Sequence, residues 1–102
     1  MQKKAILRKK LSALKVDGIL ITDLVNVRYL TGFTGSSGYL IITREHALLV
    51  TDFRYKEQAS VEVKGCKIKI EHSERSGEIK KIADAYGIKK LGFEENDVSY
   101  GF

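Results

Sequence analysis

Two short β-rich runs lie almost next to each other in the middle of the chain, and they limit the folds that it can adopt. Residues 39–43 and 47–51 are dominated by Leu, Ile and Val, and only Arg44, Glu45 and His46 separate them. Such a short connection joins antiparallel strands, because a parallel pair needs a crossover of a dozen or more residues. The sequence therefore predicts an antiparallel hairpin.

Further strands and helices are predicted around this hairpin. Residues 19–21 form an unbroken apolar run, typical of a strand covered on both faces, and residues 91–93 form a last short strand. Residues 67–71 alternate polar with apolar, which predicts a half-covered strand near a sheet edge. The predicted helices are an opening one with the buried stripe Leu7, Leu11 and Leu14, one through Tyr29 and Leu30 capped by Thr22 or Asp23, one over 53–63 ended by Gly65, and one capped by Ser76 and closed by Gly87. This order predicts an α/β fold, a mixed sheet flanked by helices.

Size and composition indicate one domain without a membrane span. The chain has 102 residues and a single cysteine, Cys66, which suits a reducing compartment. No apolar run approaches the roughly 18 residues of a transmembrane helix, and the first residues lack the apolar core of a secretory signal. A cytoplasmic protein is the resulting prediction.

The net charge of +5 comes from the start of the chain. Six of the eighteen Lys and Arg residues lie within residues 1–15, where there is no acidic residue and no aromatic one. A nucleic-acid-binding surface combines a basic face with exposed aromatic side chains. A solvated helix face is therefore favoured and no nucleic-acid partner is expected, with a basic nucleic-acid-binding domain as the alternative.

Three glycines, Gly32, Gly35 and Gly38, punctuate a loop before the hairpin. Their spacing does not match the dinucleotide-binding or P-loop patterns, and Ser36 does not complete a nucleophile elbow. Glycine at such positions allows a positive φ angle or a close approach of the backbone to another group. The loop is thus predicted to pack tightly against another part of the protein.

Residues that could carry metal or acid–base chemistry are few and scattered. His46 and His72 share no helical spacing and are expected at the surface, while Cys66 is expected to be a small packed side chain. The alternative is a free-standing ribonuclease-H-like enzyme, with Asp23, Asp52 and Glu94 as a metal-binding carboxylate set near strand ends. The residues by themselves otherwise show no catalytic apparatus.

Two stretches, residues 26–38 (NVRYLTGFTGSSG) and 51–55 (TDFRY), resemble the N-terminal domain of the creatinase/prolidase family, in particular that of Xaa-Pro aminopeptidases. The resemblance covers essentially the whole chain and is specific between Asp23 and Ala59. Phe53 departs from it, because these peptidases commonly carry glycine there. The resemblance implies a ribonuclease-H-like sheet, in agreement with the pattern of strands and helices.

The end of the chain predicts a cut fragment, because a helix that Asn96 or Asp97 would cap has too few residues; a native frayed terminus is the alternative. With the resemblance, residues 1–102 are expected to be a truncated N-terminal domain. In the family, a larger "pita-bread" domain follows and holds two divalent metal ions, commonly manganese or cobalt, on two Asp, one His and two Glu. No residue here corresponds to those ligands, so the fragment is expected to have no catalytic residue, no metal and no activity of its own. The implied partners are the missing catalytic domain, a second subunit of a homodimer and a proline-containing peptide.

For the loop, the resemblance implies a role in substrate gating and dimerisation, with residues 33–37 as a compact, adaptable wall of an active site. The expected gating or interface residues are Arg28, Tyr29, Phe33, Thr34, Gly35, Ser36, Ser37, Arg54 and Tyr55. The alternative for Tyr29 and Tyr55 is packing in the core with their hydroxyls at the rim. The choice among Xaa-Pro dipeptidase, Xaa-Pro aminopeptidase and creatinase-like branches stays open.

Overall fold

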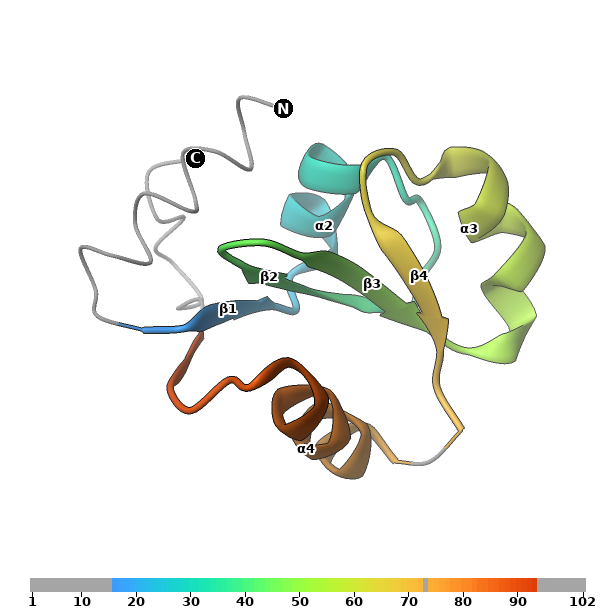
Figure 1. The fold of residues 1–102 in the computed structure, drawn as a ribbon. Coiled ribbons are helices and arrows are strands. Elements are labelled where there is room, and N and C mark those ends of the chain that lie inside the picture. The colour runs from blue at the N-terminus through green and yellow to red at the C-terminus, as the bar shows by residue number, and fades with distance from the viewer. Residues whose placement is uncertain (1–15, 73, 94–102) are drawn as a thin grey trace.

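The computed structural model describes residues 16–72 and 74–93, which form one sheet with helices on both faces (Figure 1). The strands are β1 (Gly18–Ile21), β2 (Tyr39–Thr43), β3 (Ala47–Thr51), β4 (Lys67–Ile70) and β5 (Leu91–Phe93). The helices are α2 (Leu24–Thr31), α3 (Lys56–Glu62), α4 (Arg75–Tyr86) and the short 3-10 helix η1 (Phe53–Tyr55). The predicted opening helix and the predicted cap at Asn96 or Asp97 lie outside the described residues.

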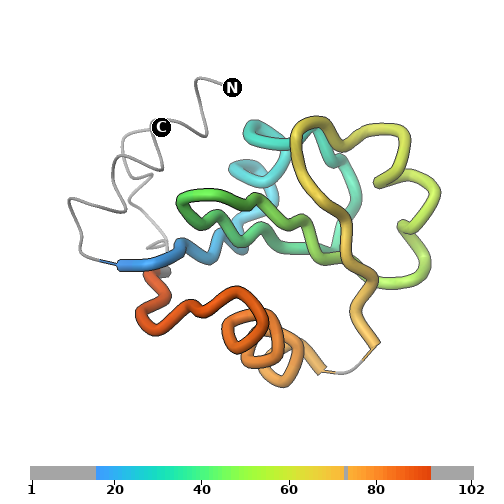
Figure 2. The backbone as a smooth tube through the Cα atoms, in the orientation of Figure 1, coloured from blue at the N-terminus to red at the C-terminus, as the bar shows by residue number. Residues whose placement is uncertain are grey.

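The five described strands are ordered β4-β3-β2-β1-β5. The β2–β3 hairpin has the predicted bounds, with Leu40 opposite Leu49, and β1 pairs antiparallel with β2. The β1–β5 and β3–β4 pairs are parallel, which confirms the mixed sheet (Figure 2). Of these strands β2 alone is reversed, so β1, β3, β4 and β5 all end at the same edge of the sheet, here called the carboxyl edge.

Alternate residues of the strands build two cores, one on each face of the sheet. On one face, Ile19, Ile42 and Leu49 pack against α2 and α3. On the other face, Ile41 and Val50 pack against α4. Figure 1 shows α2 and α3 on one side of the sheet and α4 on the other. Because β1, β2 and β3 are covered on both faces, their residues are buried throughout.

β4 lies at one edge of the sheet, as its alternating sequence predicted. The exposure of its residues rises toward its beginning, where Lys67 and Ile68 are exposed, whereas Lys69 and Ile70 are half-buried. The strand has four residues, and two of them are lysines. Short, charged strands of this kind are typical of protected sheet edges.

The helix ends follow the predicted signals in part. The side chain of Asp23 caps α2 by accepting from the N–H of Val25 at 2.8 Å, and Gly87 closes α4 with a φ of 68°. Ser76 is not the cap of α4, because the helix begins at Arg75, two residues earlier than a Ser76 cap would place it. Glu74 occupies the capping position, and the Ser76 hydroxyl donates to its carboxylate. The 53–63 segment starts as η1, and α3 ends at Glu62, where Val63 turns to extended backbone before Gly65.

Asp17 ties the beginnings of β1 and β5 together. One of its carboxylate oxygens accepts from the backbone N–H groups of Lys89 and Lys90 at 2.9 and 3.0 Å. These two hydrogen bonds hold the pKa of Asp17 below its ordinary value. The contact spans more than seventy residues of sequence and fixes β5 beside β1.

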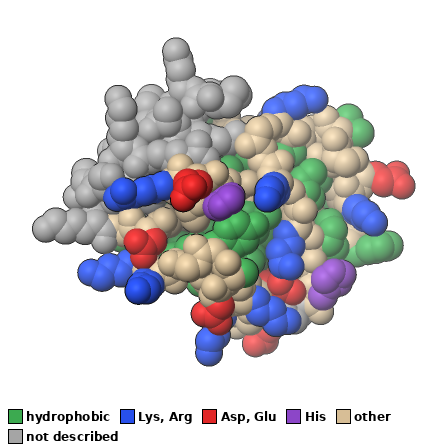
Figure 3. Space-filling model, viewed as in Figure 1, with side chains coloured by type: hydrophobic (Ala, Val, Ile, Leu, Met, Phe, Trp, Pro, Cys, Tyr) green, Lys and Arg blue, Asp and Glu red, His purple; other side chains and the backbone are tan. Residues whose placement is uncertain are grey.

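The described surface carries both signs of charge. On the face shown in Figure 3, Lys and Arg side chains are interspersed with Asp and Glu side chains over the sheet and α4. This face does not show the concentrated basic patch of a nucleic-acid binder. Within residues 16–72 and 74–93, each helix is too short or too polar to cross a membrane.

Candidate functional site

The two stretches that stood out in the sequence meet at the carboxyl edge. The hydroxyl of Ser36 is hydrogen-bonded to the hydroxyl of Tyr55, and Thr51 Oγ1 donates to the carbonyl oxygen of Ser37 at 2.6 Å. The loop of residues 32–38 therefore lies against the turn that follows β3. The exposed residues of this contact, Thr34, Ser36, Phe53 and Arg54, are here called the loop–turn surface.

The loop is also anchored on α3. Both carboxylate oxygens of Glu62 accept from Thr34, one from its N–H at 2.8 Å and the other from its hydroxyl at 2.7 Å. Gln58 Nε2 donates to Thr34 Oγ1 at 2.9 Å and to Glu62 Oε1 at 3.2 Å. These contacts favour a loop held in one position over the adaptable wall expected from its glycines.

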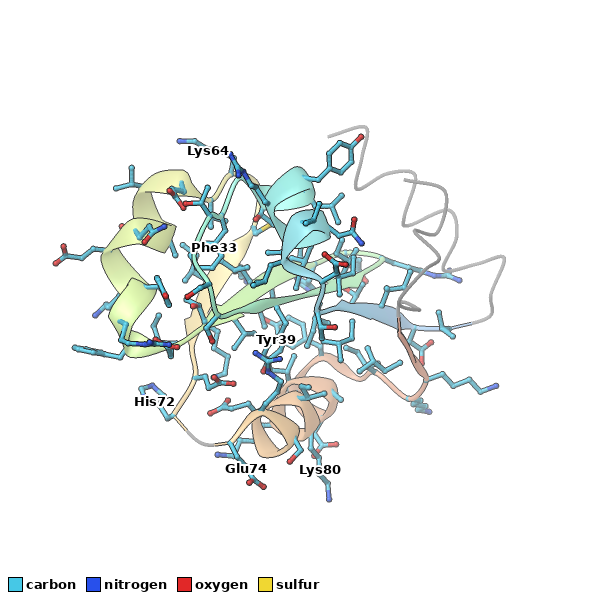
Figure 4. The ribbon with its side chains drawn as sticks, turned by 180° about the vertical axis from the view of Figure 1, so that it is seen from behind. Phe33, Tyr39, Lys64, His72, Glu74 and Lys80 are labelled. Atoms are coloured by element: carbon cyan, nitrogen blue, oxygen red, sulfur yellow. The ribbon has the colours of Figure 1, made fainter. Side chains whose placement is uncertain are left out.

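Phe33 does not belong to the exposed wall. Its side chain is 1% exposed and packs in the core on the α2 and α3 face, where Figure 4 labels it. Its ring meets that of Tyr55 edge to face, with centroids 5.8 Å apart. Phe33 is therefore buried and does not project from the loop as expected, because removing its apolar ring from water is favourable.

The glycines of the loop make this burial possible. A Cβ on Gly35 would lie 2.3 Å from Phe33 Cζ, so only glycine fits above the ring. Gly35 is itself buried and offers no side chain to a substrate. The close approach predicted for the loop is thus made to its own phenylalanine, and a positive φ of 86° occurs at Gly32.

The turn after β3 is organised by Asp52. Its carboxylate accepts from Arg54 Nε at 3.0 Å, from Arg54 Nη2 at 2.9 Å and from the Arg54 N–H at 3.0 Å. Arg54 Cζ also lies 5.1 Å from the centre of the Tyr55 ring. The guanidinium hydrogen bonds hold the pKa of Asp52 below its ordinary value. Arg54 is thus fixed in place although 69% of its side chain is exposed.

Phe53 completes this surface and was not among the expected site residues. Its side chain is 76% exposed, between the paired Asp52 and Arg54. Aromatic side chains contribute strongly to binding where a partner covers them. The sequence signal was its departure from the family's usual glycine.

Arg28 and Tyr29 lie apart from the loop–turn surface. They line a cavity of about 270 Å³ where α2 and α3 end, together with Gly32, Glu62 and Lys64. Tyr29 is 49% exposed, so it does not follow the alternative of core packing, whereas Tyr55 packs against the core with its hydroxyl at the rim. The structure therefore divides the expected residues between two neighbouring places.

The carboxylates of the alternative enzyme are engaged locally. Asp23 caps α2 and Asp52 pairs with Arg54, while Glu94 lies outside the described residues. Residues 16–72 and 74–93 hold no group of three or more His, Cys, Asp or Glu that could bind a metal ion. His46 and His72 are exposed and Cys66 packs against the core, as predicted.

The contact between Glu62 and Thr34 predicts a pH dependence of stability. The N–H of Thr34, followed by its hydroxyl, holds the pKa of Glu62 below the ordinary 4.5. The pKa of Glu62 is lower in the folded state than in the unfolded state. The stability that ionised Glu62 contributes is therefore present above the unfolded-state pKa and is lost as pH falls through the folded-state pKa. We expect the free energy of unfolding to fall between about pH 5 and pH 3, and to fall less in Glu62→Gln. Urea unfolding of both chains at each pH measures this fall in the free energy of unfolding.

Glu57→Gln, on the same helix but away from Thr34, is the matched control and should retain the full dependence. An identical pH profile for Glu62→Gln and the unchanged chain would contradict the anchoring role of Glu62.

Comparison with known proteins places the fold in a family. The family of creatinase/prolidase N-terminal domains matches residues 4–102. The "Uncharacterized peptidase YqhT" of Bacillus subtilis (strain 168) is 51% identical over 98 residues, covering 93% of this chain and 27% of that protein. The Xaa-Pro dipeptidase from Bacillus anthracis superimposes with a TM-score of 0.89 at 38% identity, over 99% of this chain and 28% of that one.

The N-terminal domain of the cytoplasmic peptidase PepQ from Mycobacterium tuberculosis H37Rv superimposes with a TM-score of 0.81 at 36% identity, over 96% of this chain and 76% of that one. This chain spans little more than a quarter of the Bacillus subtilis and Bacillus anthracis proteins. These matches confirm the resemblance of the 26–38 and 51–55 stretches: the chain belongs to the creatinase/prolidase N-terminal domain family.

Proposed function

We propose that this chain is the non-catalytic N-terminal domain of an Xaa-Pro peptidase, either a dipeptidase or an aminopeptidase, and that it acts in the cytoplasm. Its family and the names of its relatives support this assignment. Within such an enzyme, the domain limits which peptides reach the active site and contributes to the association of two subunits. Peptide bonds with proline on their carboxyl side are the substrate class.

The observation that carries the proposal is the position of the loop–turn surface relative to the end of the sheet. β5 ends at Phe93 on the same carboxyl edge from which the turn after β3 leaves. Three strand spacings separate β5 from β3, or about 14 Å. β5 therefore ends at the same edge of the sheet as the turn that carries Phe53 and Arg54.

The residues of the loop–turn surface suit contact with a peptide or a neighbouring domain rather than bond cleavage. Arg54 and Phe53 offer a held cation and an aromatic ring, and Ser36 and Thr34 offer hydroxyls. Arginine and aromatic side chains contribute strongly to binding surfaces. Two divalent metal ions, manganese or cobalt, would be held by the catalytic domain and activate water there, while this domain shapes access.

Point variants on the exposed surface test the proposal better than shortening the loop, which would remove Phe33 from the core. In the full-length peptidase that contains this domain, we expect Phe53→Ala and Arg54→Ala each to change kcat/KM about fivefold or more for peptides longer than two residues. The reason is that a gating surface contacts the parts of a peptide that extend beyond the active site. Kinetics on Xaa-Pro dipeptides and on longer Xaa-Pro peptides measure the change.

Val61→Ala, a 73% exposed position on α3, is the control and should leave both substrates unaffected. Metal content should stay unchanged in all three variants. Mixing Phe53→Ala subunits with subunits that lack a metal ligand should restore activity on longer peptides if the surface acts across a dimer, since a hybrid pairs one intact catalytic domain with one intact surface. Kinetics indistinguishable from the parent enzyme for both Phe53→Ala and Arg54→Ala would refute the gating role.

A further inference from the structure

A group of polar residues lies between the sheet and α4, beneath the carboxyl edge and away from the loop–turn surface. Tyr39, Val50 and Lys69 occupy one lateral row of the sheet on the face that α4 covers. Figure 4 labels Tyr39 on this side, next to α4. Glu71 follows Lys69 by two residues and therefore extends the same face just beyond the end of β4.

Two atoms of this group are buried without a hydrogen-bond partner among the described protein groups: Tyr39 Oη and Glu71 Oε1. The side chain of Tyr39 is 0% exposed. Burial, and then the charge of Glu71, raise the pKa of Tyr39, so its hydroxyl keeps the proton. A buried hydroxyl or carboxylate oxygen without a partner loses the hydrogen bonds that it made to water, so such atoms are seldom left unsatisfied.

The charges around these atoms balance. Glu78, 2% exposed, accepts from the N–H of His72 at 2.8 Å through Oε1, and its Oε2 lies 3.9 Å from Lys69 Nζ. Arg75 Cζ lies 4.8 Å from the centre of the Tyr39 ring. Two carboxylates thus face one lysine and one arginine. A neutral ligand suits this charge-balanced site better than a metal cation or an anion, because either ion would leave a net charge buried.

We propose that Tyr39 and Glu71 enclose a binding site for one ordered water molecule beneath the carboxyl edge. The water accepts from the Tyr39 hydroxyl and donates one proton to Glu71 Oε1. Its second proton faces the carboxylate of Glu78. Internal waters commonly make two to four hydrogen bonds, and the Tyr39 hydroxyl and Glu71 Oε1 supply two of them.

The site connects three elements of the fold. Tyr39 is the first residue of β2, directly after the glycine loop, Glu71 follows β4, and Glu78 lies in α4. A bridging water would therefore fix the point at which the loop enters the sheet. Sequence analysis missed the site, although Glu78 occupies the inner stripe of α4 with Ile82 and Tyr86 at a spacing of four, where an apolar residue is usual.

The test is the substitution Tyr39→Phe in the 102-residue chain, because it removes the hydroxyl and retains the ring. If the hydroxyl is bridged by water to Glu71, its loss removes one of the hydrogen bonds that hold the water against the buried carboxylate oxygen. We expect a fall in the folding equilibrium constant of about five- to thirtyfold, measured by urea unfolding. Tyr86→Phe, a half-buried tyrosine on α4, is the matched control and should change the constant by less than about threefold.

A crystal structure at a resolution that defines waters gives the second measurement. The proposal expects one density peak within hydrogen-bond distance of both Tyr39 Oη and Glu71 Oε1, and its loss or displacement in Tyr39→Phe. Equal or greater stability of Tyr39→Phe would overturn the proposal, because it would mean that the hydroxyl was truly unsatisfied. A direct Tyr39–Glu71 hydrogen bond, an empty space or a metal ion at the site would overturn it as well.

Discussion

Phe33→Ala is expected to lower the free energy of unfolding by about 3 to 5 kcal/mol, the usual cost of truncating a buried aromatic side chain. The ring is 1% exposed, meets Tyr55 edge to face and fills the space beneath Gly35. Removing it leaves a cavity that the loop cannot collapse to fill, because Glu62 holds Thr34 in place. Urea unfolding of the 102-residue chain, followed by circular dichroism, measures the loss.

Phe53→Ala is the control for Phe33→Ala, since it makes the same chemical change at a 76% exposed position twenty residues later. It should alter the free energy of unfolding by no more than about 0.5 kcal/mol. Similar effects of the two substitutions would contradict the burial of Phe33 and restore it to the exposed wall.

Gly32→Ala is expected to cost about 2 to 5 kcal/mol, for two separate reasons. The φ of Gly32 is 86°, a left-handed conformation that costs an alanine about 1 to 2 kcal/mol. In addition, the new Cβ would lie 2.8 Å from the backbone carbonyl oxygen of Glu62, which cannot rotate away as a side chain could. The same unfolding experiment measures the sum.

Gly87→Ala separates the two reasons. Gly87 has a φ of 68°, but its Cβ would meet no atom within 4 Å, so this variant should show the conformational cost alone. The difference between the two variants then reports the contact between Gly32 and Glu62. If Gly32→Ala and Gly87→Ala lower the free energy of unfolding equally, the close approach of Gly32 to the end of α3 is contradicted.

The sheet was the part of the fold that the sequence predicted best. The hairpin has the predicted bounds because both of its runs are apolar, β-rich and separated by a turn too short for any other connection. The edge position of β4 followed from its alternation, since a strand covered on one side keeps polar residues on the other. These signals are local, and each can be read from five to ten residues.

The candidate site could be predicted only in part, because its geometry depends on contacts distant in sequence. The resemblance selected residues 33–37 and 54–55, and the structure does bring them together through Ser36 and Tyr55. Nothing local in the sequence shows that Phe33 turns inward, since that depends on the space beside Tyr55. The sequence around Thr34 also does not show that Glu62, 28 residues later, anchors the loop.

The form of β4 limits how two copies of this domain can associate. An antiparallel pairing of two β4 strands would extend the sheet from one molecule into the next, as happens in edge-to-edge aggregation. It would also bring the lysines of one copy, Lys67 and Lys69, close to those of the other, and like charges across neighbouring strands repel. Pairing of two copies through their β4 backbones is therefore disfavoured, and an association at this edge has to use side-chain contacts instead.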